Sequence, residues 1–251
     1  MSTEWVVKII LENWPMFLRG AGVTLLIALV GTILGGIIGL LIGVIRTIPM
    51  PDRGVKRVVL KVTNTILTIY IEVFRGTPMI VQAMVIFYGS AMAFGLDMDR
   101  LVAAIIIVSI NTGAYMAEIV LGGIVSVDKG QSEAAHAIGM NHVQTMYNVV
   151  LPQVIRNILP ATGNQFIINI KDTSVLNVIS VSELFFQTKS IAGNNFRYFE
   201  SFFVASAIYL FLTLTATIIL RIIEKRLDGP DNYKKISTHI HVEKKETGMN
   251  V

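Results

Sequence analysis

An uncharged stretch from Ala21 to Ile45 constrains the fold more than any other feature of the sequence. It reads AGVTLLIALVGTILGGIIGLLIGVI and is longer than the roughly 20 apolar residues that a helix needs to cross a bilayer core. The rest of the chain agrees with a membrane protein. Of its 251 residues, 53% are hydrophobic and 15% are charged, whereas about a quarter are charged in typical soluble domains.

Four further segments are predicted to cross the membrane. The segment Val62–Ile71 is too short to span alone, and we interpret it as the cytoplasmic lead-in of a long helix that is broken near the sequence FRGTP. The predicted spans after the first are Gly76–Leu96, Leu101–Val125, the unusually polar Ile155–Val181, and Ser201–Leu220. The expected fold is an all-α membrane protein with about five transmembrane helices.

Basic residues predict the orientation, because loops rich in Lys and Arg stay in the cytoplasm. One cluster lies between the first two spans and another follows the fifth, whereas segments 97–100 and 182–199 are less basic and are expected to face outward. The N-terminus is then outside, and the C-terminus and the loop 126–150 are cytoplasmic. The clusters are Arg46, Arg53, Lys56, Arg57 and Lys61, then Arg221, Lys225, Arg226, Lys234 and Lys235.

The predicted domain organisation has three parts: residues 1–19, a transmembrane domain over 20–223, and a cytoplasmic tail over 224–251. The first part does not read as a cleavable signal peptide. Its apolar residues recur with helical spacing and include two tryptophans, which is typical of an amphipathic helix at the outer membrane interface. The alternative is a frayed terminus.

Four glycines recur at every fourth position of the first span, at Gly31, Gly35, Gly39 and Gly43. They lie on one face of the helix and allow another helix to approach closely. The partner can be a helix of the same subunit or one of a second subunit, and the motif does not decide between them.

The loop 126–150 carries the signals of two short helices. Asp128 and Gln131 resemble a capping box that starts a helix over about 129–138. Glu133 is expected in its first turn, where the helix dipole favours an anion. Gly139 fits a left-handed stop, and Asn141 with Gln144 starts a second helix that leads into Pro152.

Several function classes are excluded by what the sequence lacks. It has no cysteine, its four histidines form no zinc-like cluster with acidic residues, and its small excess of basic residues makes nucleic acid an improbable partner. We therefore expect no metal site. The phosphate-binding pattern G-x-x-x-x-G-K-[ST] does not occur, so we expect that this chain is not an ATPase, and no catalytic arrangement of Ser, His and carboxylates stands out.

The sequence EAAHAIG, followed nine residues later by VVLP, resembles the EAA loop of binding-protein-dependent ABC importer permeases. The stretches Phe74–Pro78, Ala114–Ala135, Leu151–Pro160 and Asn164–Ser174 resemble the polar amino acid subfamily, which includes histidine, glutamine and arginine permeases. The resemblance implies five spans and a loop that docks on an ATPase. The coupling residues that it implies are Gly130, Gln131, Glu133, Ala134, Ala135 and Gly139.

The same resemblance implies the partners and the location. The complex should contain two copies of an ABC ATPase subunit, which bind ATP and Mg²⁺, and a second permease subunit as a homodimer or heterodimer. An extracytoplasmic binding protein should deliver the amino acid substrate, and the complex should lie in the bacterial cytoplasmic membrane. The alternative is a stand-alone secondary transporter or channel, which should show paired inverted repeats or more spans.

Polar side chains inside the predicted spans are candidates for the substrate path, because they are costly in a membrane. Asn111, Tyr115 and Glu118 share one helix face in the third span. Glu118 and Asp172 are expected to meet a substrate ammonium, and Lys171, Arg75 or asparagines its carboxylate. The alternative is an internal network of ion pairs and amides. The candidates in the fourth span are Asn164, Gln165, Lys171 and Asp172.

Two further residue assignments rest on the predicted helix break and on the resemblance. Arg75, Thr77 and Pro78 lie near the predicted helix break and are expected to have gating or structural roles. Gln165 stands where some relatives carry glutamate, so a path lined by this side chain is less suited to a cationic substrate.

Overall fold

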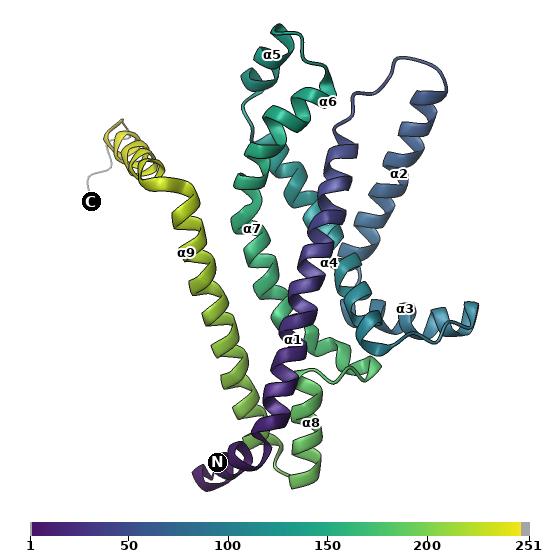
Figure 1. Cartoon of the computed structure of the whole chain (residues 1–251), viewed down its shortest axis with the longest axis vertical. Helices are drawn as coiled ribbons and strands as arrows, with labels where there is room; N and C mark the ends of the chain where they lie inside the picture. Colours follow the sequence, from purple (N-terminus) through teal and green to yellow (C-terminus); the bar gives the residue numbers. More distant parts are fainter. Residues whose placement is uncertain (1, 247–251) are drawn as a thin grey trace.

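The computed structural model describes residues 2–246, with side chains through Arg226, and every regular element in it is helical (Figure 1). The all-α membrane fold is confirmed; residues 247–251 of the predicted tail lie outside the described part. The elements are α1 (Thr3–Arg46), α2 (Val55–Gly76), α3 (Met79–Phe94), α4 (Arg100–Val125), α5 (Lys129–Ala137), α6 (His142–Thr145), the π-helix η1 (Met146–Val150), α7 (Leu151–Asp172), the 3-10 helix η2 (Thr173–Ile179), α8 (Leu184–Asn195) and α9 (Tyr198–Glu246).

Three described helices are long and apolar enough to cross a membrane: α1, α4 and the segment Tyr198–Arg226 of α9. The pair α2 and α3 meets the same test as one broken span. The predicted fourth span corresponds to α7 and η2, and α7 runs beside α1 and α4 (Figure 1) although its polar residues keep it below that hydropathy. Which end of the bundle faces the cytoplasm stays a prediction.

The predicted break near FRGTP is confirmed, but a straight second span over Gly76–Leu96 is not found. The axis turns by 114° between α2 and α3, and α3 lies across the bundle while α2 runs along it (Figure 1). Pro78 explains the break, because it disfavours helical dihedrals in the preceding residue, and Thr77 is extended with φ −119° and ψ 146°. With 16 residues, α3 is about 24 Å long at 1.5 Å per residue, short of a bilayer core of about 30 Å.

The N-terminal residues are helical, but they are not a separate element. α1 continues from Thr3 through Pro15 into the first span, and its first turns bend away from the rest (Figure 1). Pro15 accounts for the bend, because it has no N–H to donate within the helix. Ile9 and Phe17 are buried in an apolar cluster with residues of α8 and α9. The interfacial position of residues 1–19 stays a prediction.

The glycine repeat of α1 is an internal packing face against α4. A Cβ atom built on any of the four glycines would lie 2.4–2.6 Å from an α4 side chain, closer than real contacts allow. This assigns the repeat to packing within the subunit, the first of the two alternatives. The pairs are Gly31 with Val108, Gly35 with Thr112, Gly39 with Met116 and Gly43 with Val120.

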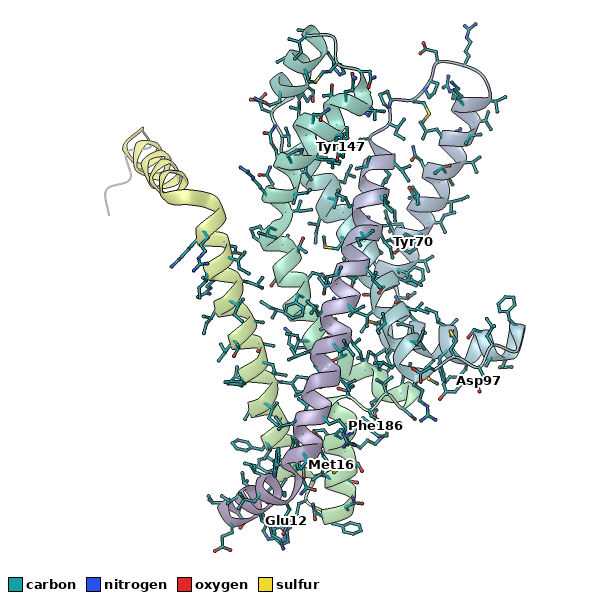
Figure 2. All side chains as sticks on the ribbon, viewed as in Figure 1. Glu12, Met16, Tyr70, Asp97, Tyr147 and Phe186 are labelled. Carbon is teal, nitrogen blue, oxygen red and sulfur yellow. The ribbon has the colours of Figure 1, made fainter. Side chains whose placement is uncertain are left out.

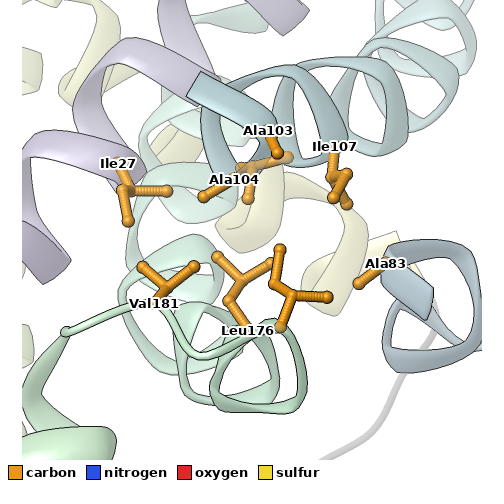
Figure 3. Packing of buried hydrophobic residues seen from close by; sticks show 9 residues of the cluster. Ile27, Ala83, Ala103, Ala104, Ile107, Leu176 and Val181 are labelled. Carbon is orange, nitrogen blue, oxygen red and sulfur yellow. The ribbon is translucent and has the colours of Figure 1, made fainter. Parts of the chain in front are cut away.

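An apolar core joins α1, α3, α4 and η2 at the end of α4 that is distant from α5 (Figures 1 and 3). Ile27 of α1, Ala83 of α3 and Leu176 of η2 are fully buried around Ala104 and Ile107 of α4. This packing holds α3 against the bundle, so the core sets the direction in which the chain turns after the break at Pro78.

Glu12, Met16 and Phe186 lie at one end of the molecule and Tyr147 lies near the other (Figure 2). The second end carries α5, α6 and the connection between α1 and α2 (Figure 1). The basic loop before α2 and the loop 126–150 therefore lie at the same end, as their predicted common side of the membrane requires.

Candidate substrate cavity and coupling segment

A cavity of about 570 Å³ lies where the α2–α3 break meets α4 and α7. It brings together four predicted path residues and all three predicted gating residues. Glu118, Asn164 and Lys171 do not line it, and Asn164 and Lys171 are exposed on α7. The lining residues are Arg75, Gly76, Thr77, Pro78, Met79, Asn111, Tyr115, Gln165, Ile168 and Asp172.

Gln82 of α3 holds the break in place. Its Nε2 lies 2.9 Å from the carbonyl oxygens of Phe74 and Thr77 and from the Thr77 hydroxyl. The Asn111 side chain donates to Gln82 Oε1 at 2.9 Å. Gln82 is not among the site residues predicted from the sequence, although a glutamine inside an otherwise apolar segment is a signal that points to it. Asn111 therefore both lines the cavity and supports its wall.

Glu118 lies beside the cavity, between two arginines. Its Oε1 accepts a hydrogen bond from Arg46 Nη1 at 3.2 Å, and its Oε2 lies 3.7 Å from Arg75 Nη1. The Arg75 guanidinium also lies over the Tyr115 ring, 5.7 Å from its centroid. Arg75 thus lines the cavity while it contacts an acid, Glu118, and the aromatic ring of Tyr115.

A buried amide network joins α7 to α1 and α4. Asn169 donates to the Thr32 hydroxyl at 2.8 Å and to the Thr112 hydroxyl at 3.0 Å. Gln165 donates to Asn169 Oδ1 at 3.3 Å, so this residue belongs both to the network and to the cavity wall. Asn169 therefore belongs to a network of amides and hydroxyls that joins the helices, the alternative to a substrate path, and it does not line the cavity.

In the predicted coupling segment, residues 126–150, α5 begins and ends close to the predicted limits of 129–138, but the expected capping box of Asp128 and Gln131 is not formed. The Asp128 side chain accepts from the Gly130 N–H at 2.7 Å at the start of α5, and Gly139 follows its end with φ +89°. The capping box of Asn141 and Gln144 is complete, with bonds of 2.9 and 3.0 Å.

Glu133 is not in the first turn of α5, and this prediction was wrong. The helix begins at Lys129, so Glu133 lies in the second turn, where the field of the helix dipole has fallen off. Five of the six predicted coupling residues are exposed: Gly130, Gln131, Glu133, Ala134 and Gly139. Ala135 is buried, and α5 packs against its neighbours α6 and η1.

Among the side chains that the structure describes, which end at Arg226, no group of three or more His, Asp or Glu could hold a metal ion. The cavity offers charged and hydrogen-bonding side chains, and α5 offers an exposed surface.

Residues 35–229 match the family model described as binding-protein-dependent transport system inner membrane component. A glutamine transport system permease protein of Escherichia coli K12 is 41% identical over 214 residues, which cover 85% of this chain and 93% of that protein. An arginine transport system permease protein of Bacillus subtilis is 32% identical, covering 86% of this chain and 94% of that one.

A solved amino acid ABC transporter has the same fold, with a TM-score of 0.74 and 36% identity over 86% of this chain and 96% of that chain. A methionine ABC transporter in an inward-facing conformation gives a TM-score of 0.71 over 90% of this chain and 99% of that chain. At 19% identity, the second likeness concerns the fold alone.

Proposed function

Because this chain belongs to the family of binding-protein-dependent transport system inner membrane components, we propose that it forms the membrane path of an ABC importer for polar amino acids. As a member of this family it is a transport component, and the homologues are amino-acid permeases. The observation that carries the proposal is the cavity at the helix break, which has one lining residue of each charge.

The cavity suits a zwitterion. The Arg75 guanidinium can bind a carboxylate through two parallel hydrogen bonds, and Asp172 can accept from an ammonium. Asn111, Tyr115 and Gln165 add neutral hydrogen-bonding groups between them. A free amino acid has one group of each charge, so it leaves neither Arg75 nor Asp172 without a partner.

A neutral polar amino acid fits this wall better than a charged one, and L-glutamine is the first candidate. Gln165 adds an amide and no charge, so it can pair with a side-chain amide. A relative at 41% identity is a glutamine permease protein, which agrees with this choice.

The proposed partners follow from the family and from the exposed coupling helix. We propose that α5 docks on one of two ABC ATPase subunits, which bind ATP and Mg²⁺, and that a second permease subunit completes the path. A binding protein on the opposite side of the membrane delivers the amino acid. This multi-pass chain is proposed to lie in a bacterial cytoplasmic membrane.

Reconstituted uptake tests the proposal. The complex, in liposomes with ATP and its binding protein, should take up labelled L-glutamine, and a panel of unlabelled amino acids should compete according to their fit. The chain purified without its ATPase should neither hydrolyse ATP nor concentrate the substrate. Concentrative uptake by the chain alone, driven by an ion gradient, would instead support the stand-alone transporter.

Gly139→Val is expected to uncouple ATP hydrolysis from transport. Gly139 has φ +89°, a region that a β-branched residue resists at a cost of about 1–3 kcal/mol, so the turn after α5 should be re-aimed. No atom lies within 4 Å of a Cβ built there, so the membrane helices should fold normally. The measurements are ATPase co-purification and substrate-stimulated hydrolysis in the same membranes.

Gly139→Asn is the matched control, because asparagine tolerates the left-handed region and should keep most of the coupling. If the Gly139→Val complex binds its ATPase subunits, shows substrate-stimulated hydrolysis and takes up substrate like the wild type, then α5 is not the segment that couples hydrolysis to transport.

A further inference from the structure

We propose that Glu118 sets the affinity of the cavity for the substrate carboxylate, because it competes with that carboxylate for Arg75. The inference deepens the proposed function and rests on it. It reverses the expectation that Glu118 contacts a substrate ammonium, because this carboxylate already lies between two arginines.

The two contacts of Glu118 are unequal. Arg46, at the end of α1, is within hydrogen-bond distance at 3.2 Å and has the less exposed side chain, at 25%. Arg75, at the end of α2, is 3.7 Å away without a hydrogen bond, and its side chain is 41% exposed. Glu118 is therefore anchored to Arg46 and only loosely paired with Arg75.

Arg75 is the cation that lines the cavity, whereas Arg46 and Glu118 are not lining residues. Two arginines and one glutamate leave this cluster with an excess of one positive charge. A carboxylate that enters the cavity is attracted to that excess, and the planar Arg75 guanidinium offers it two parallel donors. The contact of Arg75 with the Tyr115 ring keeps the guanidinium within reach of both Glu118 and the incoming substrate carboxylate.

Binding then exchanges one acid for another on Arg75. The substrate carboxylate takes the place of Glu118 Oε2, while the Arg46 hydrogen bond to Oε1 keeps Glu118 paired. No carboxylate is left without a cation, so the exchange is reversible at a low cost. The presence of Glu118 weakens substrate binding and so eases release of the substrate on the side of the ATPase subunits.

The exchange predicts opposite effects for the two partners of the ion pair. Glu118→Gln keeps the shape of the side chain and removes the competing charge, so binding should tighten by about two- to fivefold, the factor expected for a partly exposed ion pair. Arg46→Gln frees Glu118 to pair fully with Arg75, so binding should weaken by a similar factor. Arg46→Lys keeps the charge and should stay near the wild-type affinity.

The experiment measures equilibrium binding of labelled L-glutamine to the complete complex with its ATPase subunits, in nanodiscs without nucleotide or binding protein. Two unlabelled competitors separate the two ends of the substrate. Glutaramic acid keeps the carboxylate and lacks the α-ammonium, and L-glutaminamide keeps the ammonium and lacks the α-carboxylate. Glu118→Gln should tighten the binding of L-glutamine and of glutaramic acid but leave the binding of L-glutaminamide unchanged. A purely structural role of Glu118 would not produce this selectivity.

Co-purification of the ATPase subunits shows that each variant is assembled. Weaker L-glutamine binding in an assembled Glu118→Gln complex would make Glu118 a ligand of the ammonium, and unchanged binding would show that there is no competition. In both cases the binding of L-glutamine to the Asp172→Ala complex is also measured. If that variant loses binding, the proposed cavity stands and only the role of Glu118 is rejected. A wild-type complex that transports L-glutamine without binding it would overturn the cavity and this inference together.

Discussion

Asp172→Ala is expected to lower amino-acid uptake by about tenfold or more, the scale of about 1.4 kcal/mol, while the complex stays assembled. Asp172 is the acid among the cavity-lining residues, opposite in charge to Arg75. Without it, a substrate ammonium that leaves water meets no counter-charge at that wall. The measurement is initial uptake in liposomes that contain equal amounts of assembled complex.

Asp97→Ala provides the control, because Asp97 is an exposed acid in the connection between α3 and α4, outside the cavity. It should keep wild-type uptake. If Asp172→Ala transports like the wild type, Asp172 does not contact the substrate. If instead the complex falls apart, the carboxylate belongs to a network that holds the helices together.

Gly39→Val is expected to abolish recovery of folded chain. A Cβ atom at this position would lie 2.4 Å from Met116 Cβ and 2.6 Å from the Met116 backbone carbon. A side chain could rotate away, but a backbone atom in the middle of α4 cannot. Overpacking of a core commonly costs about 1–3 kcal/mol, and here the glycines on both sides repeat the same tight fit, so α1 cannot shift locally to relieve it.

Gly36→Val is the matched control, because it places the same side chain on the same helix where no atom lies within 4 Å. The measurement is the yield of monodisperse protein in detergent and the temperature at which it unfolds. Equal yields from the two variants would show that α1 and α4 can separate without loss of the fold.

Local rules in the sequence were sufficient for much of the coupling segment. Asp128 starts a helix because its side chain accepts from an early N–H, and Gly139 stops it because glycine adopts positive φ without strain. Pro78 likewise marked the break between α2 and α3. Each of these signals acts within a few residues, so no knowledge of the tertiary fold was needed. The start of α5 at Lys129 was predicted correctly, but Glu133 is the fifth residue from that start and so lies beyond the first turn, where it had been expected.

The arrangement of the cavity depends on contacts that the sequence does not order. The 114° turn after α2 is set by the core under α3, because a proline breaks a helix without choosing a direction. Glu118 was a natural candidate for an ammonium ligand until the fold placed Arg46, 72 positions earlier, against it. The partners of Gln82 were hidden for the same reason, because they come from the end of α2 and from Asn111 of α4.

The close packing of the four α1 glycines on α4 indicates which parts of the molecule should move together. Because four glycines of α1 meet four α4 side chains at close range, we expect the two helices to move as one body. A connection of only three residues, 126–128, joins α4 to α5, so any displacement of α5 would reach this body through a short connection. The contact of Glu118 with Arg46 lies inside the body and should persist, whereas its contact with Arg75 crosses to α2 and is the one that a movement would break.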